Sequence, residues 1–391
     1  MKNIKAALAA FVLFLITIIG IKVLVVGDMP GYNISYGTWI QESKFASNKG
    51  LKKLLEDKNS IPVFGSSELR HCQKTGFHAD SIYKNTEIEP VFIGRGGYQS
   101  LNHAITLGSM GDTLKNRKVI LSVSPQWFKN TGVKKDAFGA SYSESNFIAF
   151  LQNKNISKST KEYVIGRMKS LTDENPILWD RIQEDVKWYT GQKLNTWDSL
   201  RKDIHSYLTD EKSQMKLYFN AMRAGVLSDK NQKKENKEIK WNKFYKKAEK
   251  KGIKKTGRNK LGMLDKVYDT RYKKRVEENS FAEPSYYTPE SIECEDLECF
   301  LDICKSENIE VLIIMCPFNG RWCDYLGLPE NKRKGFYDKV KSIAREKGVQ
   351  LADLSQYEYS DYIFEDDSHL ALKGLVMFNE QIYNFYKQPA K

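Results

Sequence analysis

Two short segments, far apart in the chain, carry residues that can perform acyl-transfer chemistry. Near the front, V-F-G-S-S-E-L-R places Ser66 and Ser67 in a turn directly after an apolar run. Near the end, Asp366 and His369 stand three residues apart. A serine hydroxyl is a weak nucleophile until a base takes its proton, and an imidazole oriented by a carboxylate is a common base. The pattern predicts a triad of Ser67, His369 and Asp366.

Each segment alone also fits an ordinary structural role. Ser66 or Ser67 would cap the helix that follows. A D-x-x-H spacing also arises by chance in a chain with five histidines. His71 is a rival base because it follows Ser67 by four residues. On a helix we expect it on the serine's side, but pointing away from the sheet edge.

Two further turns offer donors for an oxyanion. Gly97, in R-G-G-Y-Q-S, can bring its N–H close to a substrate because no Cβ intervenes. Gln126, in S-P-Q-W-F, offers a side-chain amide after the next apolar run. The alternatives are an ordinary turn for Gly97 and a surface position for Gln126.

Five apolar runs must position these residues. Continuous runs of this length are typical of strands buried on both faces of a parallel sheet. They lie at Ile61–Phe64, Pro90–Ile93, Lys118–Val123, Glu310–Met315 and Val349–Leu354. With crossover helices between them, they predict an α/β three-layer sandwich with a mostly parallel central sheet. Every candidate residue follows a predicted strand or precedes the final helix, expected over residues 370–386, and ligands of such sheets bind at the carboxyl ends of strands.

The interval from about residue 130 to 290 contains no strong strand pattern. Helical patterning over 157–171 and 199–227 predicts a large, mainly helical insertion that ends in a basic block. Residues 230–260 hold 14 Lys or Arg and 3 Glu, so this block carries most of the net charge of +13. For an exported protein this charge indicates anionic lipid headgroups or phosphate-rich polymers rather than nucleic acid. A solvated helix face is the alternative.

The N-terminus predicts a membrane anchor over residues 1–27. The stretch from Ala6 to Val26 has one charge, Lys22, and its length is about 30 Å at 1.5 Å per residue, near the thickness of the hydrocarbon core. Two lysines before it favour a cytoplasmic N-terminus. We therefore expect residues 28–391 to form an extracytoplasmic catalytic domain. A cleaved signal peptide is the alternative, although no good cleavage site follows.

The six cysteines give little direction. None has C-x-x-C spacing, which argues against a structural zinc site. Cys316 and Cys323 are close enough in sequence to form a disulfide in an exported protein, and the alternative is that the cysteines are buried thiols. We predict neither a metal nor a cofactor.

In chain order, these candidate residues resemble the SGNH (GDSL-type) hydrolase superfamily. Its members have a serine after the first strand, a glycine after the second, an amide side chain after the third, and D-x-x-H near the end. The resemblance implies that Ser67 is the nucleophile and that its backbone and Gly97 form an oxyanion hole, with Gln126 in place of the usual asparagine. Ser66 stands where aspartate is common, and no G-x-N-D motif is present.

A closer resemblance covers nearly the whole chain. The anchor, G-S-S-E-L, I-G-R-G-G-Y-Q-S-L, S-P-Q-W-F, K-W-N-K-F-Y-K-K-A-E-K-K-G, P-F-N-G-R-W-C-D-Y-L-G and D-S-H-L-A-L-K-G-L are similar to the D-alanyl-lipoteichoic acid biosynthesis protein D (DltD-type) family. Cys323 and Ala371–Leu372 depart from the residue types expected there.

This resemblance implies a single-pass protein of Gram-positive bacteria, acting outside the membrane in the esterification of teichoic acid with D-alanine. Its implied partners are a membrane-bound O-acyltransferase, the teichoic acid polymer and a D-alanyl carrier protein. Ser67 would form the acyl-enzyme. Two alternatives are an esterase or acetyltransferase of wall polysaccharide, and a non-catalytic subunit that recruits the carrier protein or the polymer.

Overall fold

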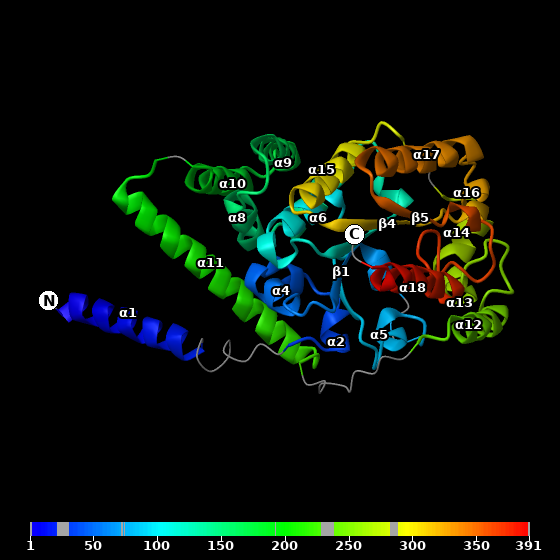
Figure 1. The fold of residues 1–391 in the computed structure, drawn as a ribbon, viewed down its shortest axis with the longest axis horizontal. Coiled ribbons are helices and arrows are strands. Elements are labelled where there is room, and N and C mark those ends of the chain that lie inside the picture. The colour runs from blue at the N-terminus through cyan, green and yellow to red at the C-terminus, as the bar shows by residue number, and fades with distance from the viewer. Residues whose placement is uncertain are drawn as a thin grey trace.

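Five parallel strands form the central sheet of the computed structural model, which describes residues 2–21, 31–71, 73, 75–191, 193–227, 238–281 and 288–389. The strands are β1 (Ser60–Phe64), β2 (Glu89–Ile93), β3 (Lys118–Val123), β4 (Glu310–Met315) and β5 (Gln350–Asp353). Their order is β2-β1-β3-β4-β5, and every neighbouring pair is parallel (Figure 1). The prediction of an α/β fold with a parallel sheet is confirmed, although β5 is shorter than its predicted run.

Helices cover both faces of this sheet. Successive side chains of a strand point to opposite faces, so Leu121 and Ile313 enter one buried cluster while Ile120 and Ile314 enter another. The first cluster also takes side chains from α6 (Ser100–Gly108), α15 (Glu293–Ser306) and α17 (Glu330–Lys347). The second takes them from α5 (Ala79–Ile82), α12 (Trp241–Lys255) and α18 (Leu372–Lys387). The sheet is thus the middle of three layers.

The chain between β3 and β4 is helical in its described residues, with no strand. It contains η4 (Pro125–Trp127), α7 (Lys135–Ser141), α8 (Glu144–Gln152), α9 (Lys158–Leu171), α10 (Pro176–Tyr189), α11 (Thr196–Arg223), α12, α13 (Asp265–Val267), η5 (Tyr268–Tyr272), α14 (Lys273–Glu277) and α15. Helices α9 and α11 lie where the sequence shows helical patterning. The expected boundaries of an insertion, and of a domain beginning at residue 28, stay predictions.

Shorter helices complete the connections. They are α2 (Ile34–Gly37), α3 (Glu42–Ala46), α4 (Asn48–Leu54), η2 (Ser67–Leu69), η3 (Gly111–Thr113), α16 (Gly320–Tyr325) and η6 (Ser355–Tyr357). Helix α12 holds much of the predicted basic block, and residues 230–237 of that block lie outside the described residues.

The predicted transmembrane helix is not found. Over the described ranges, no helix combines the length and the apolar character needed to cross a membrane. Helix α1 (Lys2–Ile21) covers part of the predicted anchor, whereas residues 22–27 lie outside the described chain. The uncharged part of α1 runs from Ala6 to Ile21, only about 24 Å at 1.5 Å per residue. The predicted span of about 30 Å also included the apolar residues up to Val26, which lie outside the described chain.

The considered disulfide is also absent. Cys316 and Cys323 are both buried free thiols, as are Cys294, Cys299 and Cys304. Burial raises the pKa of Cys316 to about 12, which keeps it in the unreactive thiol form at neutral pH. Cys72 lies outside the described residues.

Candidate active site

The turn after β1 fixes the position of Ser67. The N–H of Gly65 donates to the carbonyl of Ile93 at 3.0 Å, and the hydroxyl of Ser66 donates to the carbonyl of Arg95 at 3.1 Å. The turn is therefore tied to the loop that follows β2. The side chain of Ser66 makes no capping bond to η2, which begins at Ser67. The helix-cap alternative does not describe Ser66.

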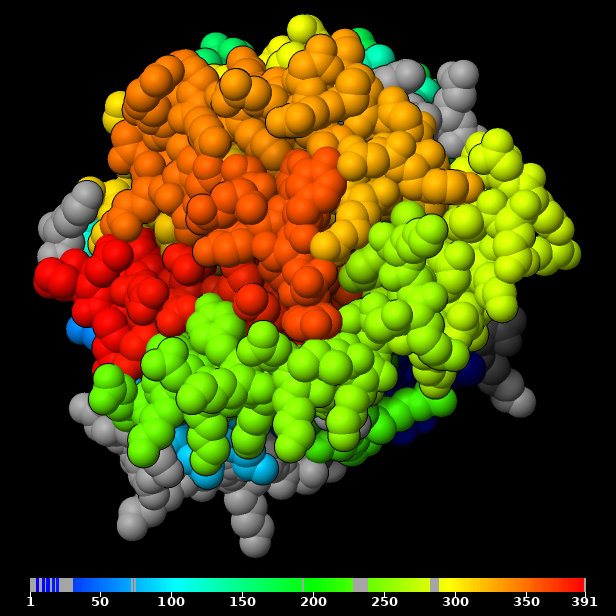
Figure 2. Space-filling model, turned by 90° about the vertical axis from the view of Figure 1, so that its right-hand side faces the viewer, coloured from blue at the N-terminus to red at the C-terminus, as the bar shows by residue number. Residues whose placement is uncertain are grey.

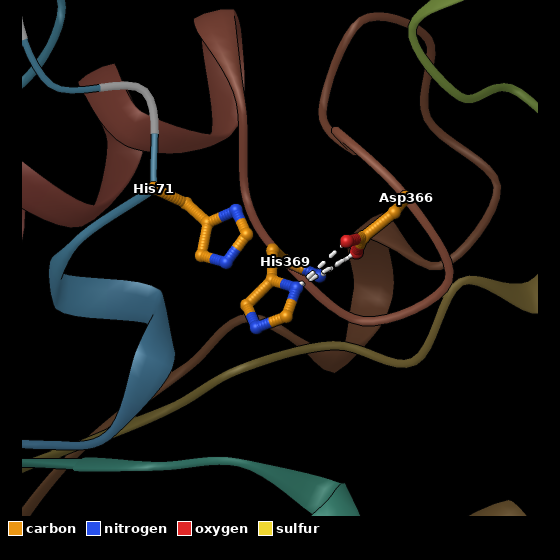
Figure 3. A group of neighbouring side chains, drawn as sticks. All are labelled: His71, Asp366 and His369. Carbon is orange, nitrogen blue, oxygen red and sulfur yellow. Dashed lines mark hydrogen bonds and ion pairs between the residues drawn. The ribbon is translucent and has the colours of Figure 1, made fainter. Parts of the chain in front are cut away.

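A tight turn near the C-terminus holds the imidazole and its carboxylate together. One oxygen of Asp366, Oδ1, accepts backbone bonds from Ser368 (3.0 Å) and His369 (2.8 Å). Both oxygens of Asp366 also lie 2.9 Å from Nδ1 of His369 (Figure 3). The N–H of Glu365 donates to the carbonyl of His369 at 2.8 Å, which closes the turn. These bonds fix the plane of the imidazole.

The two segments meet through a hydrogen bond between Ser67 and His369. Nε2 of His369 lies 2.7 Å from Oγ of Ser67, across 302 positions of sequence. Ser67, His369 and Asp366 therefore form a continuous hydrogen-bonded chain at the carboxyl end of β1. This is the arrangement in which an imidazole can take a proton from a serine hydroxyl while a carboxylate stabilises the charge it gains.

Burial and neighbouring charges shift the pKa of both partners. Burial opposes ionisation of Asp366, but the hydrogen bond and charge of His369 outweigh it and lower the pKa of the carboxyl. Burial likewise disfavours the charged imidazole. The contacts with Asp366, together with the charges of Glu68 and Asp367, outweigh it and raise the pKa of His369 above 6.5. His369 is thus a stronger base than an isolated histidine.

His71 does not point away from the site as expected. Its ring lies face to face with that of His369, with centroids 3.6 Å apart and an interplanar angle of 12° (Figure 3). Its Nδ1 lies 3.2 Å from Oε1 of Glu365. The expectation was wrong because η2 ends at Leu69, so the helical geometry that we assumed does not continue to residue 71. His369 is the imidazole that contacts the serine hydroxyl.

Within the described part of the chain, two groups of side chains bring possible metal-ligand atoms within 4.8 Å of one another. The first is His71, Asp366 and His369, but the rings of His71 and His369 are stacked, so their nitrogen lone pairs lie in two nearly parallel planes about 3.6 Å apart and do not converge on one ion. The second is His205 with Glu144 and Asp185, each 3.5 Å away, which is also the geometry of a histidine paired with two carboxylates. Neither group has a feature that distinguishes a metal site from an ion pair.

The predicted oxyanion donors lie on loops at the same end of the sheet. Gly97 has φ +88°, and a Cβ on its neighbour Gly96 would lie 3.8 Å from Cβ of Ser67, so this loop lies directly against the serine. Gly94 has φ +134°, and a Cβ there would overlap the carbonyl of Gly65. Only glycine permits this approach of the two loops.

Beside the triad lies a pocket of about 460 Å³. Gln126 lines it together with Asp367 and Ser368, the two residues before His369. Aromatic rings form much of the remaining wall: Tyr272, Phe281, Phe318 and Trp322. Figure 2 shows the face of the molecule that carries η5, α14 and α16, with α12 lying along α18.

Three cations in this pocket were missed by the sequence analysis. They are Lys129, Arg271 and Arg275, against one lining carboxylate, Asp367. Nη1 of Arg271 lies 3.9 Å from Oδ2 of Asp366, and the guanidinium of Arg275 lies 4.1 Å from the centre of the Phe281 ring. No local pattern distinguishes these residues from the many other cations of the helical region. Lys129 follows Gln126 by three residues, whereas only the folding of the helical region onto the sheet edge brings Arg271 and Arg275 to the site.

Comparison with known proteins agrees with this arrangement. The family model described as "DltD protein" matches residues 37–387. The chain is 30% identical over 347 residues to Protein DltD of Bacillus subtilis (strain 168), covering 86% of this chain and 84% of the relative. It is 26% identical to Protein DltD of Staphylococcus aureus (strain NCTC 8325 / PS 47), covering 90% and 84%. It is 24% identical to Protein DltD of Lacticaseibacillus rhamnosus, covering 84% and 78%. With its family match spanning nearly the whole folded chain, the protein belongs to the DltD family.

Proposed function

We propose that this protein is a serine acyltransferase that passes D-alanine onto teichoic acid through an acyl-enzyme on Ser67. The observation that carries the proposal is the 2.7 Å contact between Oγ of Ser67 and Nε2 of His369, with Asp366 behind it. Membership of the DltD family supports D-alanylation as the pathway, because D-alanyl-lipoteichoic acid biosynthesis is the process for which the family is named.

The first half-reaction forms the acyl-enzyme. Nε2 of His369 takes the proton of Ser67 as Oγ attacks the carbonyl carbon of an activated D-alanyl ester or thioester. The carbonyl oxygen becomes an oxyanion, which the backbone N–H groups of Ser67 and Gly97 and the side chain of Gln126 would stabilise. When the intermediate collapses, the bond to the leaving group breaks, and the leaving group receives the proton from His369.

The second half-reaction reverses these steps with a hydroxyl of the polymer as nucleophile. His369 takes the hydroxyl proton, the polymer oxygen attacks the acyl carbon, and the bond to Ser67 breaks as its Oγ regains a proton. Lys129, Arg271 and Arg275 line the adjacent pocket and would hold a phosphate of the polymer there. Water would give hydrolysis in place of transfer.

The proposed setting is the outer face of the cell membrane. There the protein would act with a membrane-bound O-acyltransferase, which supplies D-alanine carried in the cytoplasm by a D-alanyl carrier protein. The excess of cations in the pocket and on α12 suits an anionic polymer.

Complementation of a deletion strain with a Ser67→Ala variant tests the proposal. We expect little restoration of D-alanyl ester in the wall, because loss of a triad member typically removes several orders of magnitude of rate. Ser66→Ala is the matched control. Among the described residues, its hydroxyl bonds to the carbonyl of Arg95, and the bond of Gly65 to Ile93 still ties the turn when that hydroxyl is lost, so we expect near-complete restoration. Equal restoration by Ser67→Ala and wild type would instead support a non-catalytic recruiting subunit.

Mass spectrometry of the intact protein separates transfer of D-alanine from other acyl chemistry. After incubation with D-alanyl and acetyl thioesters, we expect a D-alanyl adduct that is absent from Ser67→Ala. An acetyl adduct alone would replace the proposal with an acetyltransferase or esterase of wall polysaccharide.

A further inference from the structure

The exposed apolar surface of this protein is concentrated on one side. Fifteen large apolar side chains are exposed among the described residues: five on α1, one on α10, seven on α11 and only two elsewhere. Helices α1 and α10 and the first half of α11 lie at one end of the molecule, whereas α13, α14 and α16, beside the candidate active site, lie at the other (Figure 1). The apolar side is therefore remote from the site.

The seven side chains of α11 form one stripe. With about 100° of rotation per residue, positions 197, 200, 204, 207 and 208 share a face, and positions 219 and 222 return to it beyond a gap in the stripe. The stripe consists of Trp197 (67% exposed), Leu200, Ile204, Tyr207, Leu208, Phe219 and Met222. Helix α11 has 28 residues, so the stripe extends along about 40 Å.

A different face of α11 holds the helix against the domain. Leu217 and Ala221 are fully buried, and the helix contacts α3, α4 and α8. These two positions lie roughly 100–140° around the helix from the centre of the stripe. Glu211 is also buried, and it faces the same way as the stripe, within the gap between positions 208 and 219. The seven exposed side chains on either side of this gap are consequently a second apolar surface, which the packing of Leu217 and Ala221 does not explain.

Cations border one edge of the stripe. Arg201, Lys212, Lys216 and Arg223 follow the same edge and are exposed, and the guanidinium of Arg201 lies 5.9 Å from the centre of the Trp188 ring. On the opposite edge, Asp210 is paired with Lys49 at 3.3 Å. The surface therefore combines an apolar face, exposed Trp and Tyr side chains and exposed positive charge.

We propose that α11 lies in the interfacial region of an anionic phospholipid bilayer, with its stripe in the acyl boundary and its basic edge at the headgroups. A bilayer offers the apolar phase and the negative charge together, along a straight line of this length. Tryptophan and tyrosine favour this interface because each has an apolar ring and a polar group. The exposed apolar residues of α1 on the same side extend the surface.

Quenching of Trp197 by brominated lipid tests this placement. The full-length protein is bound to vesicles of phosphatidylglycerol and phosphatidylcholine, with the phosphatidylcholine brominated on its acyl chains. The emission lost in a Trp197→Phe variant isolates the contribution of Trp197, even where α1 also holds the protein on the vesicle. We expect bromination to reduce that contribution at least twofold, and to leave the contribution of Trp241, isolated with Trp241→Phe, unchanged.

Two variants test the features that carry the proposal. Leu200→Gln/Ile204→Gln removes exposed apolar atoms and should reduce quenching of Trp197 at least threefold. Lys212→Gln/Lys216→Gln/Arg223→Gln should reduce it in vesicles with phosphatidylglycerol, and added salt should have the same effect on wild type. Equal emission of Trp197 in brominated and unbrominated vesicles would overturn the proposal. So would a sedimentation experiment without lipid in which the protein self-associates and Leu200→Gln/Ile204→Gln abolishes the association.

Discussion

The imidazole of His71 stacks on that of His369, with ring centroids 3.6 Å apart. Glu365 holds the outer ring through Nδ1 of His71, and its N–H bonds to the carbonyl of His369. The ring of His369 is therefore held both within its own plane and on one face. Asp366 fixes it by hydrogen bonds in its own plane, and His71 covers one of its faces. This second constraint gives His71 a positioning role in the proposed reaction.

Replacing His71 with alanine should lower kcat/KM by about 2- to 10-fold, because an aromatic pair contributes about 0.5–1.5 kcal/mol and about 1.36 kcal/mol corresponds to a factor of ten. His71→Phe keeps a flat ring in the same place and should recover most of the loss. Acyl transfer from a D-alanyl thioester measures both variants. If His71→Phe were as slow as His71→Ala, a polar role for His71 would replace stacking.

Replacing Asp366 with asparagine should reduce kcat about 1,000-fold or more, because the imidazole loses the carboxylate that orients it and stabilises its charge. The fold should persist, since the amide oxygen of the new side chain can still accept the backbone bonds of the turn. Asp361→Asn is the control. Asp361 is 65% exposed and pairs with Arg321, so we expect unchanged kcat. Single-turnover acylation of Ser67 is the measurement.

The pH profile should follow the proton on His369. The base is active only when neutral, and its pKa is raised in the fold, so activity should increase with pH and reach half its maximum above pH 6.5. In Asp366→Asn, the hydrogen bond and the charge of Asp366, which contribute most to raising the pKa of His369, are lost, while burial and the smaller effects of Glu68 and Asp367 remain. The midpoint of the residual activity should therefore move to lower pH. A midpoint that stays in place would show that another group controls the profile.

Gly94→Ala should lower the free energy of unfolding by about 4 kcal/mol or more, because its Cβ would overlap the carbonyl of Gly65. Gly76→Ala is the matched control. Gly76 also has a positive φ (+85°), but nothing lies within 4 Å of the added carbon, so only backbone strain of about 1–2 kcal/mol is expected. Denaturant unfolding gives both values. Equal losses would mean that strain, not the overlap of the two loops, limits position 94.

Arg275→Ala should raise KM for an anionic acceptor about 5-fold and weaken the dependence of KM on salt, because a cation of the pocket is lost. It should leave single-turnover acylation of Ser67 nearly unchanged, since Arg275 does not contact the triad. Arg345→Ala, on the surface of α17, controls for net charge. Slower acylation of Ser67 without a change in KM for the acceptor would instead indicate that Arg275 contacts the acyl donor.

Local patterns in the sequence predicted the parallel strands and the meeting of Ser67 with His369 and Asp366, whereas the oxyanion roles of Gly97 and Gln126 stay predictions. Buried apolar runs indicated the strands, and turn residues after them indicated Ser67, Gly97 and Gln126. Geometry that depends on tertiary packing was not predictable. The stack of His71 on His369 follows from the early end of η2, and Arg271 reaches the pocket because a helical segment folds across the sheet edge. Both are contacts between residues distant in sequence, with no local signal.

The contact of Gly65 with Gly94 has a consequence for how the selectivity of the proposed acyl transfer can change. The loops after β1 and β2 meet through main-chain atoms, so the distance between the serine and the glycine loop does not depend on any side chain that mutation could resize. In the proposed reaction, new preferences for the acyl group or its acceptor would therefore arise in the pocket wall, which the helical region and the segment after β4 largely supply. The position of Ser67 relative to the glycine loop can thus stay fixed while substitutions in the pocket wall change which substrates fit.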